Sequence, residues 1–258
     1  VATKKGIPVV HVEAGLRSFD RAMPEEINRV LTDQISDLLF TTEKTALANL
    51  VREGIDPKRV HFVGNVMIDT LLWNLKRAIP ADQTLPGLAA KAYGLVTMHR
   101  PSNVDHPEIL ARLFETLKKI SEQLPLVFPI HPRTQAMAER QSLLADGGDI
   151  HFLPPAGYLN LLGLLKDASL VLTDSGGLQE ESTALGVACL TLRENTERPI
   201  TLSEGTNRLV GNEPERILRG FAEIMKDGAK QGRVPDLWDG QASQRIVAVL
   251  ANWLGAAP

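Results

Sequence analysis

The stretch LVLTDSGGLQEES, residues 170–182, runs from a short strand into a helix through the turn Ser175-Gly176-Gly177. At such a junction the unpaired backbone N–H groups and the positive end of the helix dipole point to one spot, which suits a phosphate group. Glu181 follows just over one turn into the helix, where its carboxylate could accept hydrogen bonds from a ribose diol. A glycine turn without any ligand is the plain alternative. The combination favours nucleotide binding.

The same alternation of strand and helix extends from this stretch in both directions. Short β-rich runs separated by longer stretches of helical period predict an α/β fold with parallel sheets. Polar or glycine residues follow each run, and open α/β sheets bind ligands at the carboxyl ends of their strands. The expected strands are 8–12, 38–41, 59–63, 94–98, 126–130, 151–153, 170–173 and 187–192.

The chain is expected to form two domains. Residues 78–88 contain Pro80, Pro86 and Gly87 and are typical of a linker. We expect a first domain over 1–78, with the closing amphipathic helix 241–258 packing back on it, and a second domain over 79–240. The first apolar run begins soon after Val1, which favours the loss of an N-terminal segment.

Composition excludes several classes of protein. The 258 residues carry a net charge of −3, which gives no basic field for nucleic acid or an anionic membrane. No apolar run reaches the length of about 18 residues that a membrane span needs. The single cysteine, Cys189, lies in an apolar run and is expected to be a buried spacer. We expect a cytoplasmic protein.

Two stretches near the start carry candidate catalytic carboxylates, HVEAGLRS at 11–18 and PEEINR at 24–29. Glu13 follows a strand, and Pro24 suits the first turn of a helix. On that helix Glu25 and Arg29 are expected opposite an apolar face of Ile27, Val30, Leu31, Ile35 and Leu38. An ordinary surface ion pair is the alternative for Glu25 and Arg29. Paired carboxylates with Glu13 would suit proton abstraction and return.

Three further stretches are weaker signals. His99 and Arg100 follow a strand, His131 precedes Pro132, and RENTERP at 193–199 places Arg198 where it could neutralise a pyrophosphate. Structural or solvated roles stay open for each of them. No metal-ligand spacing and no Gly-x-Gly-x-x-Gly pattern occurs, so neither a metal nor a nicotinamide cofactor is indicated.

Taken together, these stretches resemble the non-hydrolysing UDP-N-acetylglucosamine 2-epimerase family. The resemblance implies two Rossmann-like domains of the GT-B type and a homodimer. It also implies reversible conversion of UDP-GlcNAc to UDP-ManNAc without a cofactor, by elimination and re-addition of UDP. The matching stretches are HVEAGLRS, PEEINR, VGNVMIDTLL at 63–72, HR at 99–100, HP at 131–132, TDSGGLQEE at 173–181 and RENTERP.

The resemblance also assigns roles to residues. Glu13 and Glu25 are the implied catalytic acids, with Arg29 and His99 beside them, and His131 and Arg100 fall at an activator site. The implied contacts to UDP are Ser175, Gly176, Gly177, Glu181 and Arg198.

This chain departs from the family pattern in a few places. The family's arginine-bearing first turn and its catalytic Gly-Asp turn would precede Val1. Ser102 stands where glutamate is common, and Leu161, close to Tyr158, stands where an aromatic often supports uracil. A hydrolysing epimerase, a GT-B glycosyltransferase and a non-catalytic UDP-sugar-binding protein are the alternatives.

Overall fold

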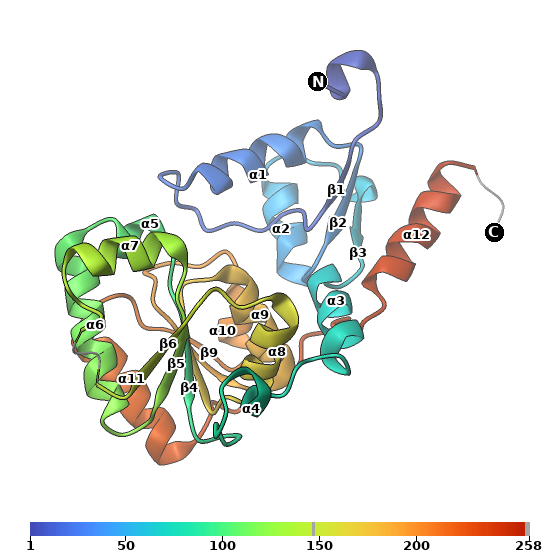
Figure 1. Cartoon of the computed structure of the whole chain (residues 1–258). Helices are drawn as coiled ribbons and strands as arrows, with labels where there is room; N and C mark the ends of the chain where they lie inside the picture. Colours follow the sequence, from blue (N-terminus) through green and yellow to red (C-terminus); the bar gives the residue numbers. More distant parts are fainter. Residues whose placement is uncertain (146–147, 256–258) are drawn as a thin grey trace. The chain divides into compact units, whose positions relative to one another are not determined.

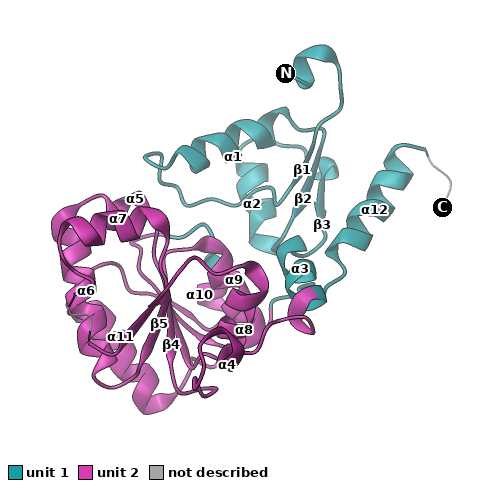
Figure 2. Cartoon of the chain, in the orientation of Figure 1, with its two compact units in different colours: residues 1–73, 196–200, 235–258 teal, residues 74–195, 201–234 magenta. Residues whose placement is uncertain are grey.

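The computed structural model describes residues 1–145 and 148–255, which form two compact units (Figure 2). Unit 1 comprises Val1–Trp73, Thr196–Ile200 and Pro235–Pro258, of which residues 256–258 lie outside the described part. Unit 2 comprises Asn74–Asn195 and Thr201–Val234. Unit 1 is therefore assembled from three separate stretches of the sequence.

Unit 1 contains a three-stranded parallel sheet in the order β1-β2-β3 (Figure 1). The central strand β2 is buried on both faces, as is usual in parallel sheets. Leu39 packs with Leu50 on one face, while Leu38 and Phe40 pack with Ile246 on the other. The strands are β1 (Val10–Val12), β2 (Leu38–Thr41) and β3 (Val60–Phe62). The helices are η1 (Thr3–Lys5), α1 (Pro24–Ile35), α2 (Lys44–Arg52), η2 (Pro57–Arg59), α3 (Val66–Leu75) and α12 (Ala242–Trp253).

Unit 2 contains a six-stranded parallel sheet in the order β6-β5-β4-β7-β8-β9. The direction of winding reverses between the neighbours β4 and β7, and open α/β sheets bind ligands at such a switch point. The strands are β4 (Gly94–Thr97), β5 (Leu126–Pro129), β6 (Ile150–Leu153), β7 (Leu170–Thr173), β8 (Ala188–Thr191) and β9 (Asn207–Leu209). The predicted α/β fold with parallel sheets is confirmed.

Helices cover both faces of the six-stranded sheet (Figure 1). One apolar cluster lies under α6 and α11, and the other lies under α4, α8 and α9. The helices are α4 (Ala81–Thr84), α5 (Pro101–Val104), α6 (Pro107–Ser121), α7 (Pro132–Arg140), α8 (Tyr158–Asp167), α9 (Gly176–Leu185), α10 (Pro199–Ser203) and α11 (Pro214–Asp227). Within the part of the chain described here, no helix has the length and apolar composition needed to cross a bilayer.

Residues 78–88 differ from the expected linker. They form α4 and pack within unit 2, where Ala81 is 3% exposed and Leu85 and Leu88 contact the apolar cluster. The carbonyl of Ile79 approaches α8 so closely that a Cβ on Gly163 would lie 1.7 Å from its oxygen. Proline is common in linkers and equally common in the first turn of a helix, so this composition alone does not separate the two.

Helix α1 presents several apolar side chains to solvent. Ile27, Leu31 and Ile35 are 42%, 59% and 49% exposed, whereas Glu26 and Asp33 are 3% and 0% exposed. The sequence grouped these apolar residues with Leu38 on one side of a helix, but α1 ends at Ile35 and Leu38 belongs to β2. The helix instead buries carboxylates that receive hydrogen bonds from the preceding turn.

Candidate functional site

The turn after β1 places Glu13 in an unusual backbone conformation. Its φ is 72°, and Gly15 two residues later has a φ of 77°. Glycine adopts this left-handed region readily, but a glutamate rarely does. Such backbone strain is concentrated at functional sites. Glu13 is thus held at a sharp turn directly behind a parallel strand.

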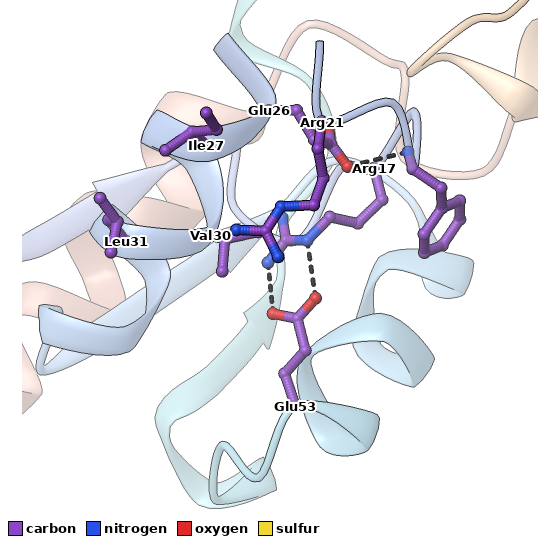
Figure 3. Close-up of a pocket in the computed structure, with 8 residues that line it drawn as sticks. Arg17, Arg21, Glu26, Ile27, Val30, Leu31 and Glu53 are labelled. Carbon is purple, nitrogen blue, oxygen red and sulfur yellow. Dashed lines mark hydrogen bonds and ion pairs between the residues drawn. The ribbon is translucent and has the colours of Figure 1, made fainter. Parts of the chain in front are cut away.

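A buried ionic network holds this turn in place. Asp33 accepts hydrogen bonds from Gly15 N at 3.1 Å, Arg17 Nη2 at 2.7 Å and the His11 ring at 2.6 Å. Arg17 also donates to Glu53 through Nε at 2.8 Å and Nη2 at 2.6 Å (Figure 3). Burial opposes the charge on Arg17, but these hydrogen bonds outweigh it and raise the pKa of the guanidinium.

The side chain of Glu13 contacts a candidate from a distant part of the sequence. Arg198 Nη2 donates to Glu13 Oε1, and both residues belong to unit 1. A second ion pair joins the neighbouring Glu197 to Arg29, with 3.7 Å between Oε1 and Nη2. The structure therefore brings together Glu13, Arg29 and Arg198.

The two adjacent glutamates of α1 have different environments. Glu26 is buried and accepts hydrogen bonds from Ser18 N at 3.0 Å and Phe19 N at 2.8 Å. Glu25 is exposed at the first turn of the helix. Glu26 therefore fixes the turn, and Glu25 keeps its place as the second candidate acid.

Glu26, Asp33 and Glu53 were not predicted as site residues. Glu26 and Asp33 are seven apart, which places them on one face of α1, and this spacing was the available signal. A pocket of about 300 Å³ lies beside Glu26 and Glu53 (Figure 3). Its lining residues are Arg17, Phe19, Arg21, Glu26, Ile27, Val30, Leu31 and Glu53.

In unit 2, Asp174 holds the loop after β4 against the end of β7. Its carboxylate is fully buried and accepts hydrogen bonds from His99 N at 3.0 Å, Arg100 N at 2.9 Å and Asn103 Nδ2 at 3.2 Å. The His99 ring lies against the same group, with Nδ1 3.2 Å from Asp174 Oδ1.

His131 lies close to His99, with 5.7 Å between the ring centroids. His131 Nδ1 accepts a hydrogen bond from Arg133 N at 3.1 Å, so its proton is assigned to Nε2. The structure brings together His99, Arg100 and His131 at the ends of β4 and β5.

The predicted phosphate turn is the start of α9. Ser175 is the N-cap residue, and its hydroxyl makes no capping hydrogen bond within the described residues. The first N–H groups of a helix lack partners inside the helix, so they can donate to an anion. Below the turn, Gln179 donates to Ser175 O at 3.2 Å and accepts from Asn207 Nδ2 at 3.2 Å.

Glu181 is 6% exposed on the same helix. The hydroxyl of Tyr158, the first residue of α8, donates to Glu181 Oε1 at 3.0 Å. Burial raises the pKa of Glu181, while the bond from Tyr158 acts in the opposite direction. Leu161 is partly buried against the apolar cluster of unit 2. No group of three or more His, Cys, Asp or Glu side chains in residues 1–145 and 148–255 is placed to hold a metal ion.

Comparison with known proteins gives consistent matches. The family model described as UDP-N-acetylglucosamine 2-epimerase matches residues 1–251. The UDP-N-acetylglucosamine 2-epimerase of Methanococcus maripaludis is 43% identical, over 96% of this chain and 70% of that protein. The UDP-2,3-diacetamido-2,3-dideoxy-D-glucuronate 2-epimerase of Pseudomonas aeruginosa is 41% identical, over 97% of this chain and 70% of that protein.

A solved structure shows the same fold. The UDP-GlcNAc 2-epimerase of Methanocaldococcus jannaschii, in complex with UDP-GlcNAc and UDP, matches with a TM-score of 0.89 and 43% identity. The match covers 98% of this chain and 71% of that one. This likeness confirms the expected GT-B type of architecture. With the family model matching almost the whole chain and identities above 40%, the chain belongs to the UDP-N-acetylglucosamine 2-epimerase family.

Proposed function

We propose that this chain catalyses the reversible epimerisation at C2 of UDP-N-acetylglucosamine, which gives UDP-N-acetylmannosamine. The reaction proceeds by elimination and re-addition of UDP, and the enzyme is an isomerase. Family membership supports the reaction class. The observation that carries the mechanism is the turn at Glu13, where a carboxylate with a strained backbone is paired with Arg198.

The chemistry explains why both charges are needed. The C2 hydrogen is not adjacent to a carbonyl and is weakly acidic, so departure of UDP must develop positive charge on the sugar. Negative charge develops on the pyrophosphate at the same time. The start of α9 and Arg198 suit the leaving group, while carboxylates suit the sugar and the proton. Each such contact lowers the barrier by about 3 kcal/mol in comparable sites.

The ion pair between Arg198 and Glu13 suggests how binding and proton transfer are coupled. A diphosphate that accepts hydrogen bonds from Arg198 competes with Glu13 for the same guanidinium. Its binding would release the Glu13 carboxylate for the C2 proton, and its departure from the site would restore the pair. This order prevents the base from acting before substrate is bound.

We assign the remaining roles on the same basis. Glu25 is the second proton-transfer group, and Arg29 and His99 support catalysis. His131 and Arg100 would form an activator site for a second UDP-GlcNAc. The residues proposed to bind UDP are Ser175, Gly176, Gly177, Glu181 and Arg198. Action in the cytoplasm and assembly as a homodimer stay predictions.

A second candidate substrate is favoured by one comparison. The Pseudomonas aeruginosa relative is named for UDP-2,3-diacetamido-2,3-dideoxy-D-glucuronate, and its identity of 41% is close to the 43% of the Methanococcus maripaludis enzyme. Both names describe epimerisation at C2 of a UDP-sugar. Overall identity therefore does not separate the two substrates, and both should be assayed in parallel.

The test is incubation of the protein with UDP-GlcNAc in deuterated water, followed by NMR of the recovered sugar nucleotides. We expect deuterium at C2 in both epimers, because the proton leaves and returns from solvent. A hydrolysing enzyme would instead release free N-acetylmannosamine and UDP. Absence of deuterium from C2 in recovered UDP-sugars would contradict the proposal.

A matched pair of variants tests the base. Glu13→Gln should abolish exchange and spare UDP binding. Glu223→Gln removes another carboxylate that is paired with an arginine, Arg208, and should leave the rate unchanged. Equal rates in both variants would remove Glu13 from the mechanism.

A further inference from the structure

We propose that the hydroxyl of Tyr158 positions Glu181 to bind the ribose diol of a uridine nucleotide, which makes Tyr158 a specificity-determining positioning residue. This inference rests on the proposed function, because it takes α9 as part of the UDP site. Tyr158 donates to Glu181 Oε1 at 3.0 Å from the first position of α8. The hydrogen bond joins the first residue of α8 to the middle of α9, and these two helices pack against each other.

Glu181 is placed on the face of α9 that carries the phosphate turn. It lies four residues after Gly177, and residues four apart share one face of a helix. A ligand whose phosphate occupies the start of α9 would therefore extend its sugar along the face that carries Glu181. This spacing gives the carboxylate access to a ribose rather than to the phosphate itself.

The hydrogen bonds of Glu181 leave one oxygen for a ligand. Oε1 accepts from Tyr158, and Oε2 has no partner among the described residues. Glu181 is 6% exposed, so few water molecules can reach its carboxylate, and ligand hydroxyls would supply further donors to it. The two hydroxyls of a ribose are vicinal donors, and one carboxylate oxygen can accept from both.

Tyr158 is the neighbouring titratable residue that affects the pKa of Glu181. Burial raises the pKa of Glu181, and the bond from Tyr158 lowers it, so the phenol helps to keep the carboxylate ionised. The other charged or titratable side chains on elements packed against α9 face other partners. Asp174 contacts His99, Arg208 pairs with Glu223, Asp167 lies by Lys166, and the Cys189 thiol contacts Thr191.

The second tyrosine of the chain supplies a matched control. Tyr93 is fully buried, and its hydroxyl donates to Leu164 O at 2.6 Å. Tyr158 is 39% exposed. Tyr93→Phe therefore removes a structural hydroxyl from the same unit, whereas Tyr158→Phe removes the hydroxyl on Glu181 and keeps the aromatic ring. If only the aromatic ring of Tyr158 mattered for binding, Tyr158→Phe would bind UDP as the wild type does.

The experiment is calorimetric titration of the full chain with UDP and with 2′,3′-dideoxy-UDP. We expect Tyr158→Phe to weaken UDP about tenfold, the loss of one hydrogen bond to a charged group. Affinity for dideoxy-UDP should be unchanged, because that ligand lacks the diol. Tyr93→Phe should leave both affinities as in the wild type.

The pH dependence supplies a readout that a merely structural hydroxyl would not move. UDP affinity should fall as pH decreases through the pKa of Glu181, because a protonated carboxyl offers fewer acceptors to the diol. In Tyr158→Phe the pKa-lowering bond is absent, so this fall should begin at a higher pH.

Two results would overturn the inference. The first is equal UDP affinity in the wild type and Tyr158→Phe. The second is an equal loss for UDP and dideoxy-UDP, which would indicate a general distortion rather than a lost ribose contact. If the wild-type chain does not bind UDP, the proposed function fails, and that result is distinct from both of these.

Discussion

The strained turn at Glu13 predicts that glycine is more stabilising than alanine at this position, the reverse of the usual order. We compare Glu13→Gly with Glu13→Ala, because both remove the carboxylate and its ion pair with Arg198. They differ only in what occupies a backbone with a φ of 72°. We expect the glycine variant to be the more stable of the two, and both variants to lack activity.

The magnitude follows from two opposing terms. A side chain in the left-handed region costs about 1–2 kcal/mol, which glycine avoids. Glycine has more conformational entropy to lose on folding, which favours alanine by about 0.4–1 kcal/mol. The net difference is about 0.7 kcal/mol in favour of Glu13→Gly.

Glu25 provides the matched control. It is exposed in the first turn of α1 and has no positive φ, so the same two substitutions should give the opposite order. There Glu25→Ala should be more stable than Glu25→Gly by up to about 1 kcal/mol, the helix-propensity difference.

The assay is urea denaturation followed by tryptophan fluorescence. All three tryptophans belong to unit 1, and Trp238 is 3% exposed, so the signal reports on the unit that contains Glu13. With a slope of about 2 kcal/mol per molar urea, the Glu13 pair should differ in midpoint by about 0.3–0.4 M. If Glu13→Ala is as stable as Glu13→Gly, the turn does not have the backbone described here.

Three further predictions concern the two units. Gly64→Ala should destabilise unit 1 by at least about 2 kcal/mol more than Gly54→Ala in the same urea assay. A Cβ on residue 64 would lie 2.1 Å from Leu237 O, whereas a Cβ on residue 54 would meet nothing within 4 Å. Equal urea midpoints for the two variants would contradict the close approach of Leu237 to Gly64. Asn207→Ala should lower the free energy of unfolding by about 3 kcal/mol, because it removes the hydrogen-bond partner of Gln179, Thr191 and Thr201. Denaturation followed by circular dichroism measures this change. A decrease below about 1 kcal/mol would show that the protein does not need this network. Glu181→Gln should abolish the acid limb of UDP binding, because the wild-type carboxyl, whose pKa is raised by burial, must be ionised to bind; an unchanged limb would assign it to another group. The free energy of unfolding should depend on pH in the opposite direction to UDP affinity. Because the pKa of Glu181 is raised in the folded state, its contribution to folding stability is present at low pH and is lost as pH rises through that pKa.

Apolar runs in the sequence predicted every strand of the two sheets except β9. All eight expected strands are present, because each is a run rich in apolar or β-branched residues. β9 was missed because only Leu209 of its three residues is apolar. Its first residue, Asn207, is buried through hydrogen bonds to side chains of α9 and β8, which no local pattern indicates.

The candidate site was predicted in its residue types but only partly in its contacts. Periodicity placed the apolar residues of α1 on one side of the helix, but it gave no sign that backbone amides of the preceding turn would bind Glu26. The pairing of Arg198 with Glu13 joins residues 185 positions apart and depends on the fold of the chain around them. A positive φ at a glutamate likewise follows from tertiary packing rather than from local preference.

The interrupted course of unit 1 has a consequence for biosynthesis. Its sheet strands are translated before unit 2, but Arg198, Leu237 and Ile246, which contact that sheet or its turns, emerge from the ribosome much later. Unit 2 contains no residue beyond 234, so it can fold before the C-terminal segment that packs on strands β1–β3 has been synthesised. A nascent chain stalled before residue 235 should therefore expose the β1–β3 strands to proteases and chaperones.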